Sequence, residues 1–168
     1  TMLRIAFENA PEVINPTQTL DRLLSHGCWC AKLDYNNAQN LPYLGGSTTV
    51  DELDEICKYW FKCRNCNDRL KNGSCNVEGS TSREKLFTGS FELRYDDNDF
   101  QNTAMCNNPA DQCSDDTCVI DLHHIKKLVD FIDENGGGLD LPVEVTAQNQ
   151  ICSSTGMNPE MKRKCSGS

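Results

Sequence analysis

Residues 50–63 read Val50-Asp51-Glu52-Leu53-Asp54-Glu55-Ile56-Cys57-Lys58-Tyr59-Trp60-Phe61-Lys62-Cys63, and they carry the clearest structural signal in the chain. The apolar residues of this stretch recur at three- and four-residue steps, which places them on one face of a helix. Thr49 and Glu52 have the spacing of a capping box, in which a hydroxyl and a carboxylate satisfy amide donors. The sequence therefore predicts a long amphipathic helix that starts near Thr49 and stops at Gly73.

Two more helices are expected, one on each side of this stretch. A first helix should start at Asn15-Pro16, where asparagine can cap and proline suits the first helical position, and should end at Gly27. A third should start near Asp116-Thr117 and end at Asn135-Gly136. Its apolar residues have helical period: Val119, Leu122, Ile125, Val129 and Ile132.

Three other segments have a weaker pattern. Residues 86–95 are expected to form a strand or hairpin, and residues 139–145 alternate as in a strand. Residues 2–7 are apolar enough for either a strand or a short helix, and the periodicity does not distinguish the two. The tail after Ser153 is polar.

The 11 cysteines are the most unusual feature of the composition. Zinc binding is one explanation, because Cys63 and Cys66 have C-x-x-C spacing and Cys113 and Cys118 could complete a site. No second C-x-x-C exists, and the cysteines are scattered, so disulfides and a secreted chain are expected. An odd number leaves at least one cysteine free or bridged to another molecule. The cysteines are Cys28, Cys30, Cys57, Cys63, Cys66, Cys75, Cys106, Cys113, Cys118, Cys152 and Cys165.

Charge and hydropathy exclude some function classes. The net charge of −9 leaves no basic patch to displace counterions from nucleic acid, so we expect no nucleic-acid partner. No apolar run approaches the length of a transmembrane helix. The chain starts at Thr1 without a signal-like segment, as a mature, processed chain would.

Three motifs resemble secreted phospholipase A2. Gly27-Cys28-Trp29-Cys30 is similar to the family's G-C-Y-C-G motif, and residues 50–63 match the spacing of its helix that reads P-V-D-x-x-D-x-C-C-x-x-H-D-x-C. Cys118-Val119-Ile120-Asp121 is similar to the C-x-C-D of the facing helix. The resemblance is dense over residues 27–66 and weak over 113–130. It implies a disulfide-stapled, mainly helical fold with two long antiparallel helices, an N-terminal helix and a β-hairpin.

The departures from the family concern its chemistry. The resemblance places Trp60 where the family has the catalytic histidine, and Phe61 where it has the calcium-ligating aspartate. An indole cannot accept a proton and a phenyl ring cannot ligate a hard cation. Asp121 matches the aspartate that orients the histidine, but has no histidine to orient, and an ordinary place on a polar helix face explains it. The calcium loop is interrupted by residues 33–40. Loss of catalysis is therefore expected, and Trp60 should pack against the third helix, in the space that a catalytic pair would need.

The resemblance also implies disulfide pairings. It pairs Cys30 with Cys57, and Cys28 with Cys152 or Cys165. One family bridge is absent at both ends, where Ile56 and Lys127 stand. The remaining six cysteines are expected to form three bonds among themselves, in a pairing that the sequence leaves open: Cys63, Cys66, Cys75, Cys106, Cys113 and Cys118.

Other candidate sites are weaker. Residues 133–144 place Asp133, Asn135 and Glu144 at positions 1, 3 and 12 of an EF-hand-like loop, although a glycine-rich helix stop explains the same letters. Ca²⁺ is thus only an alternative, and no other cofactor is expected. Asn72-Gly73-Ser74 is a glycosylation sequon. His123 and His124 adjoin Asp121, but adjacent helical residues point in different directions.

The resulting hypothesis is a non-catalytic extracellular protein with an interaction or structural role. Its expected parts are an extended N-terminal arm (1–14), a phospholipase A2-like core (15–135), and a C-terminal strand and tail (136–168). The terminal strands could pair copies of the chain into a ring or a filament. The alternatives are pairing of those strands within one chain, a divergent secreted lipid hydrolase, and a calcium-binding module.

Overall fold

The computed structural model describes residues 2–34, 45, 49–70, 93–107 and 112–139; the side chains of 68–70 and 112–115 are not described. This part is mainly helical with one small antiparallel sheet, as the sequence predicts. The elements in chain order are α1 (Met2–Glu8), α2 (Pro16–Leu23), the 3-10 helix η1 (Ala31–Leu33), α4 (Glu52–Leu70), β1 (Leu93–Arg94), α6 (Phe100–Thr103), β2 (Met105–Cys106) and α7 (Gln112–Glu134).

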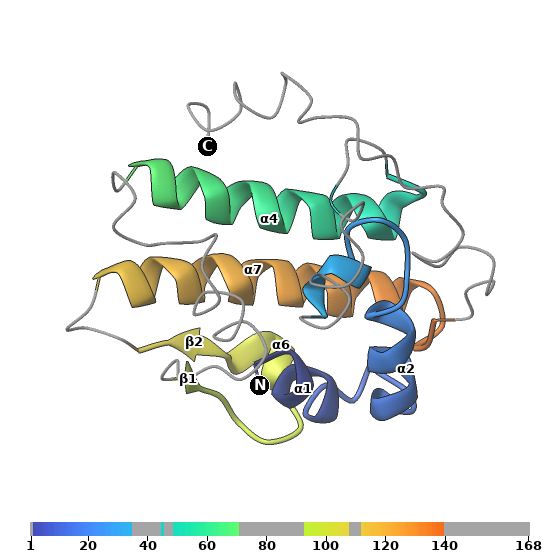
Figure 1. Ribbon diagram of the computed structural model, residues 1–168. Helices are drawn as coiled ribbons and strands as arrows, with labels where there is room; N and C mark the ends of the chain where they lie inside the picture. Colours follow the sequence, from blue (N-terminus) through green and yellow to red (C-terminus); the bar gives the residue numbers. More distant parts are fainter. Residues whose placement is uncertain (1, 35–44, 46–48, 71–92, 108–111, 140–168) are drawn as a thin grey trace.

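The helix α7 lies at the centre of the described fold. It runs antiparallel to α4 on one side and packs against α1 and β2 on the other (Figure 1). Its apolar stripe explains this position, because residues at three- and four-residue steps cover both contacts. The fully buried members of the stripe are Cys118, Ile125, Leu128, Val129 and Ile132.

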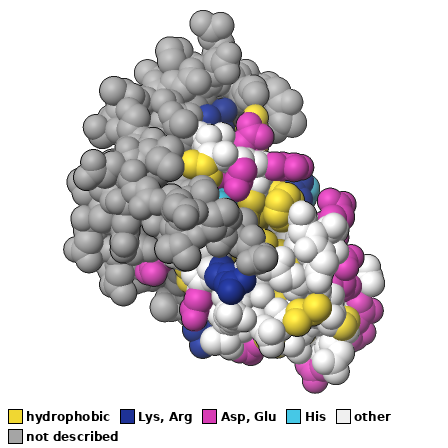
Figure 2. Space-filling view, turned by 90° about the vertical axis from the view of Figure 1, so that its right-hand side faces the viewer, with side chains coloured by type: hydrophobic (Ala, Val, Ile, Leu, Met, Phe, Trp, Pro, Cys, Tyr) yellow, Lys and Arg dark blue, Asp and Glu magenta, His cyan; other side chains and the backbone are white. Residues whose placement is uncertain are grey.

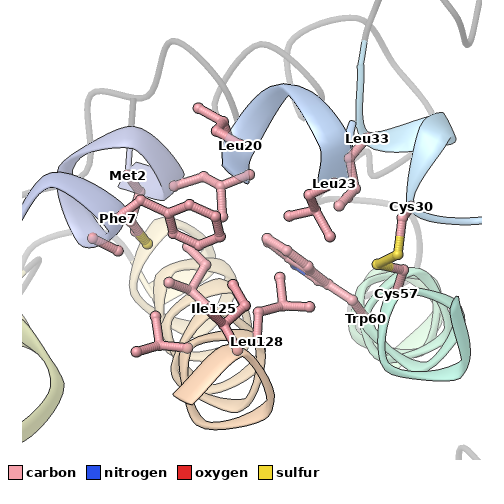
Figure 3. Packing of buried hydrophobic residues seen from close by; sticks show 14 of the residues in the cluster. Met2, Phe7, Leu20, Leu23, Cys30, Leu33, Cys57, Trp60, Ile125 and Leu128 are labelled. Atoms are coloured by element: carbon pink, nitrogen blue, oxygen red, sulfur yellow. A yellow bond between two sulfur atoms is a disulfide. The ribbon is translucent and has the colours of Figure 1, made fainter. Parts of the chain in front are cut away.

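The core lies where α1, α2, α4 and α7 meet. In the close-up view, the Trp60 indole extends from α4 toward the aliphatic side chains of α2 and α7, including Leu23 and Leu128 (Figure 3). Trp60 and Leu23 are completely buried. Trp60 is therefore central to the core, at the position where the resemblance to phospholipase A2 places a catalytic histidine.

The cap of α4 lies two residues later than the sequence predicts. Helix α4 begins at Glu52, and the Asp51 Oδ1 accepts a hydrogen bond from the Asp54 amide at 2.9 Å. The Asp54 Oδ2 in turn accepts one from the Val50 amide at 3.2 Å. Asp51 therefore takes the capping role expected of Thr49. A carboxylate suits this place, because the helix N-terminus is positively polarised.

The N-terminal segment is helical, so the extended arm expected over residues 1–14 is wrong. Met2, Leu3, Ala6 and Phe7 are buried on one face of α1. Their spacing is helical, and the helix packs on α2 and α7. Because this segment is a helix packed in the core of its own chain, it cannot serve as a strand for a neighbouring copy. The expected C-terminal strand lies outside the described residues, except for Leu139.

Three other element predictions need adjustment. Only residues 93–95 of the predicted strand or hairpin at 86–95 lie in the described part. Leu93 and Arg94 form β1, which pairs with β2, with Leu93 opposite Cys106. Helix α7 begins at Gln112 rather than at 116. Its first turn has no apolar stripe, and for this reason the periodicity missed it. At the start of α2, Asn15 is left-handed (φ 49°) and its side chain makes no capping bond, contrary to expectation.

The disulfides confirm part of the expected pattern. Cys30 is bonded to Cys57, as the resemblance implies, and joins the segment before η1 to α4 (Figure 3). Cys106 is bonded to Cys118, which ties β2 to α7. Cys28 and Cys66 are also disulfide-bonded, whereas Cys75, Cys152, Cys165 and the Cys113 side chain lie outside the described part.

One cysteine prediction is wrong. Cys63 has a free thiol and is exposed, so the six remaining cysteines do not form three bonds among themselves. The reason lies in its helix face. Trp60 and Arg64 point from α4 into the interior and are buried, whereas Cys63 lies between them in sequence and points outward. Burial raises the pKa of its thiol, against the lowering influence of Lys127 and Lys62.

The turn after α7 provides a matched pair of glycine substitutions. Gly136 and Gly137 both have positive φ, at 89° and 88°. A Cβ on Gly137 would lie 2.9 Å from the Glu12 carbonyl oxygen and from Ile14, whereas a Cβ on Gly136 would meet nothing within 4 Å. Gly136→Ala should cost about 1–2 kcal/mol through its backbone alone. Gly137→Ala should cost about 1–3 kcal/mol more because of the clash. Urea unfolding of the two variants measures the difference, and equal losses would contradict the close contact.

Candidate functional site between the two long helices

The candidate site is centred on Trp60 of α4 and Asp121 of α7. The Trp60 Nε1–H donates a hydrogen bond to the Asp121 Oδ1 at 2.7 Å. Both side chains are fully buried. This confirms the prediction that Trp60 packs against the third helix. The resemblance to phospholipase A2 gives this carboxylate the role of orienting a histidine, but here it accepts a hydrogen bond from an indole N–H, which cannot act as a base.

Asp121 does not lie on a polar face, so that part of the sequence interpretation is wrong. It follows Cys118 by three residues and precedes Ile125 by four, which puts it on the apolar stripe of α7. This spacing was a signal in the sequence that could have placed it in the interior. Burial raises the pKa of Asp121 to about 6, against the lowering influence of the Arg64 charge and of the hydrogen bond from Trp60.

Arg64 is the buried charge closest to this carboxylate. Its Nε lies 3.5 Å from the Asp121 Oδ1, and its side chain is 1% exposed. The residue stands one turn after Trp60 on the same face of α4. Arg64 was not predicted to be buried, although the sequence places it four residues after Trp60. A buried aspartate and arginine at this spacing form an ion pair between the two longest helices.

His124 completes the cluster from the other side of the indole. Its ring stacks on Trp60 with centroids 6.0 Å apart and planes 11° apart. Its Nδ1 lies 2.8 Å from the Ile120 carbonyl oxygen, which can only accept, so Nδ1 carries the proton. Burial lowers the pKa of His124 to about 4, so the ring is neutral at neutral pH. Its exposed neighbour His123 meets it edge-on, and burial also lowers the pKa of that ring.

Phe61, which stands where the resemblance places a calcium-ligating aspartate, lies in a separate aromatic cluster with Trp29. The two ring centroids are 6.2 Å apart and both side chains are buried. The Lys32 Nζ lies 5.1 Å from the Phe61 centroid and 5.7 Å from that of Trp29, and the Lys58 Nζ lies 5.8 Å from that of Trp29. Gly45 adjoins the Lys32 side chain. Ammonium groups over aromatic faces are favourable, but aromatic faces supply no oxygen to a hard cation.

The segment with the Gly-Cys-Trp-Cys motif is held by a single buried carboxylate. Asp54 accepts hydrogen bonds from the backbone amides of Cys28, Trp29 and Cys30 at 3.0, 2.8 and 3.0 Å. Gly27 makes this wrap possible, because its φ is 64° and a Cβ there would lie 2.4 Å from the Asp54 Oδ1. The sequence analysis placed Asp54 in a motif but did not foresee this role.

A second contact supports the same junction. The buried His26 Nε2 lies 2.8 Å from the Asp51 Oδ2. Burial is the largest single effect on Asp51 and raises its pKa. The hydrogen bond from His26, the His26 charge and hydrogen bonds from backbone amides lower the pKa, and together they outweigh burial, so the net shift is downward. Asp51 therefore connects the chain before the motif to the first turn of α4.

The alternative calcium site is only partly described. Asp133 is exposed at the end of α7, and the Asn135 Nδ2 donates to the Phe131 carbonyl oxygen at 2.7 Å. Asn135 thus acts at the helix end, where the sequence placed the stop. Glu144 and the sequon residue Asn72 lie outside the described part. Within the described ranges, no three His, Cys, Asp or Glu side chains converge as a metal site would require.

Comparisons with protein-family models, curated proteins and solved structures give no match to this chain. None of the described helices combines the length and the apolar character needed to cross a membrane.

Proposed function

We propose that this chain is a non-catalytic extracellular protein that uses a phospholipase A2-like scaffold for an interaction or structural role. The observation that carries the proposal is the hydrogen bond between Trp60 and Asp121. In an enzyme of the related family, the same helix pair would hold a histidine that activates water. Here an indole fills that position, and its only polar atom is a donor already used inside the protein.

The surroundings of Phe61 support the same proposal. The related family would hold Ca²⁺ between this position and the loop after Cys30. Here the Lys32 ammonium lies over the Phe61 ring and its side chain adjoins Gly45, the described remnant of that loop. A positive charge at this place repels a second cation, and no carboxylate stands at position 61 to offset it.

The disulfides and the surface charge support an extracellular setting and a protein partner. Disulfides persist in oxidising compartments, and the two described bridges join different elements, at sequence separations of 27 and 12 residues. Acidic side chains are spread over the described surface at the end of the molecule where α4 begins and α7 ends (Figure 2). This charge suits a soluble partner better than nucleic acid or an anionic membrane. Assembly from copies of the chain remains a prediction, without the N-terminal strand as its mechanism.

Lipid hydrolysis tests the absence of catalysis. Purified chain should release fatty acid from phospholipid vesicles at the background rate, with and without Ca²⁺, because neither a base nor a cation site is present at the degenerate positions. Asp121→Asn should have the same rate as the wild type. Calcium-dependent turnover that is lost in Asp121→Asn would instead establish the divergent hydrolase.

Calorimetric Ca²⁺ titration tests the remaining alternative. The proposed scaffold protein should release no heat of binding. Saturable binding that is lost in Asp133→Asn would establish the calcium-binding module and contradict the proposal. Met105→Ser is a suitable control, because Met105 on β2 is 57% exposed and belongs to neither candidate site.

A further inference from the structure

We propose that Asp121 is an internal proton-binding group, whose protonation at Oδ2 stabilises the folded state in mildly acidic surroundings. The inference rests on the described contacts of this carboxyl group and not on the proposed function. It would hold equally for an enzyme or a binding module.

The geometry gives the two carboxyl oxygens different environments. Oδ1 accepts the Trp60 hydrogen bond and lies 3.5 Å from the Arg64 Nε. Oδ2 is fully buried and has no hydrogen-bond partner among the described residues. When a carboxylate oxygen is buried without a hydrogen-bond donor, it loses its hydration and no new hydrogen bond offsets that cost, so the ionised form is destabilised. A proton on Oδ2 removes the charge and leaves Oδ1 free to keep its bond to Trp60.

The groups around Asp121 do not compensate fully for this loss. From α4, Arg64 is the charged group that faces it. From α7 itself, His124 is one turn away and its pKa is lowered to about 4, so it is neutral where Asp121 titrates. Helix α1 packs on α7 through apolar residues, and its charged residues Arg4 and Glu8 are exposed; β2 has no charged residue. Burial therefore outweighs the single cation, and the pKa of Asp121 rises to about 6.

The direction of the pH effect follows from this shift. The ordinary pKa of 3.8 applies to the unfolded chain, so the folded state binds the proton roughly a hundredfold more tightly. The contribution to stability is fully present below pH 3.8, and it is lost as the pH rises through about 6. His124 acts in the opposite direction in this window, because its lowered pKa makes the unfolded chain take up that proton first.

Carbon NMR of side-chain carboxyl groups tests the proposal directly. In the whole protein with labelled aspartate, one carboxyl resonance should titrate with a midpoint near 6. This resonance should disappear in Asp121→Asn. It should remain in the control variant Asp133→Asn, because Asp133 is exposed in the wild type. A wild-type spectrum in which no aspartate has a midpoint near 6 would overturn the proposal.

A second variant keeps the test decisive if Asp121→Asn folds poorly, and urea unfolding adds an independent readout if it folds. In Trp60→Phe, the lost hydrogen bond should move the same midpoint to higher pH, because that bond lowers the pKa of Asp121; an unchanged midpoint would contradict the assignment. Urea unfolding of the wild type and Asp121→Asn should differ in pH dependence by up to roughly a hundredfold in the equilibrium constant. Both proteins contain the same histidines, so the difference between their pH profiles reports on Asp121. Parallel pH profiles would overturn the proposal.

Discussion

Trp60→Ala should lower the free energy of unfolding by about 3–5 kcal/mol, the usual cost of removing a buried aromatic side chain. Trp60 is completely buried at the centre of the core (Figure 3). The substitution leaves a cavity between α2, α4 and α7 and also removes the hydrogen bond to Asp121. The remaining carboxylate would then have only the ion pair with Arg64 to offset its burial. Urea unfolding followed by circular dichroism measures the loss.

Trp60→Phe separates the two contributions. Phenylalanine keeps much of the packing and the stacking surface for His124, but it cannot donate to Asp121. Leaving a buried acceptor without its partner costs about 1–3 kcal/mol, so this variant should lie between the wild type and the alanine variant. Tyr59→Phe is a control on the adjacent residue, which is 39% exposed, and it should change stability by less than about 0.5 kcal/mol. Equal losses for Trp60→Phe and Tyr59→Phe would show that the hydrogen bond does not matter.

Much of the fold follows from residue periodicity. The stripes of α4 and α7 predict two long helices with one buried face each, and the structure confirms both. The resemblance implied the Cys30–Cys57 bridge, which the structure also contains. Helix α1 could not be predicted, because a six-residue apolar segment fits a strand as well as a helix. Its docking on α2 and α7 decided between them, and such a contact is not visible in a local pattern.

The candidate site was predicted in part. The sequence placed Trp60 against the third helix, but Asp121 was assigned to a polar face, Arg64 was missed, and His124 was set aside although it adjoins Asp121. The reason is that charge was used to infer exposure, while the helical spacing of these residues pointed inward. A charged residue is buried when a partner is available, and that partner stands on another helix. The sequence of one helix therefore does not show whether its charged residue is buried, because the partner belongs to the other helix.

Asp54 illustrates the same lesson for a carboxylate whose partners are backbone amides. It is completely buried, although it belongs to an acidic run at the start of α4. Three consecutive amides, those of Cys28, Trp29 and Cys30, donate to its two oxygens. Hydrogen bonds to an ionised acceptor are roughly twice as strong as neutral ones. This carboxylate therefore holds the segment that leads into η1, and the Cys30–Cys57 bridge fastens the same place covalently.

Asp54→Ala should consequently lower the free energy of unfolding by about 3 kcal/mol or more, because each buried amide without an acceptor costs about 1–3 kcal/mol. Glu55→Ala is the matched control, since Glu55 is the adjacent residue, has the same charge and is exposed; it should change stability by less than about 0.5 kcal/mol. Urea unfolding at neutral pH with the disulfides intact measures both. Hydrogen exchange at the Trp29 and Cys30 amides should also become faster in Asp54→Ala alone. If both variants unfolded at the same urea concentration, the bridge rather than the carboxylate would hold this segment.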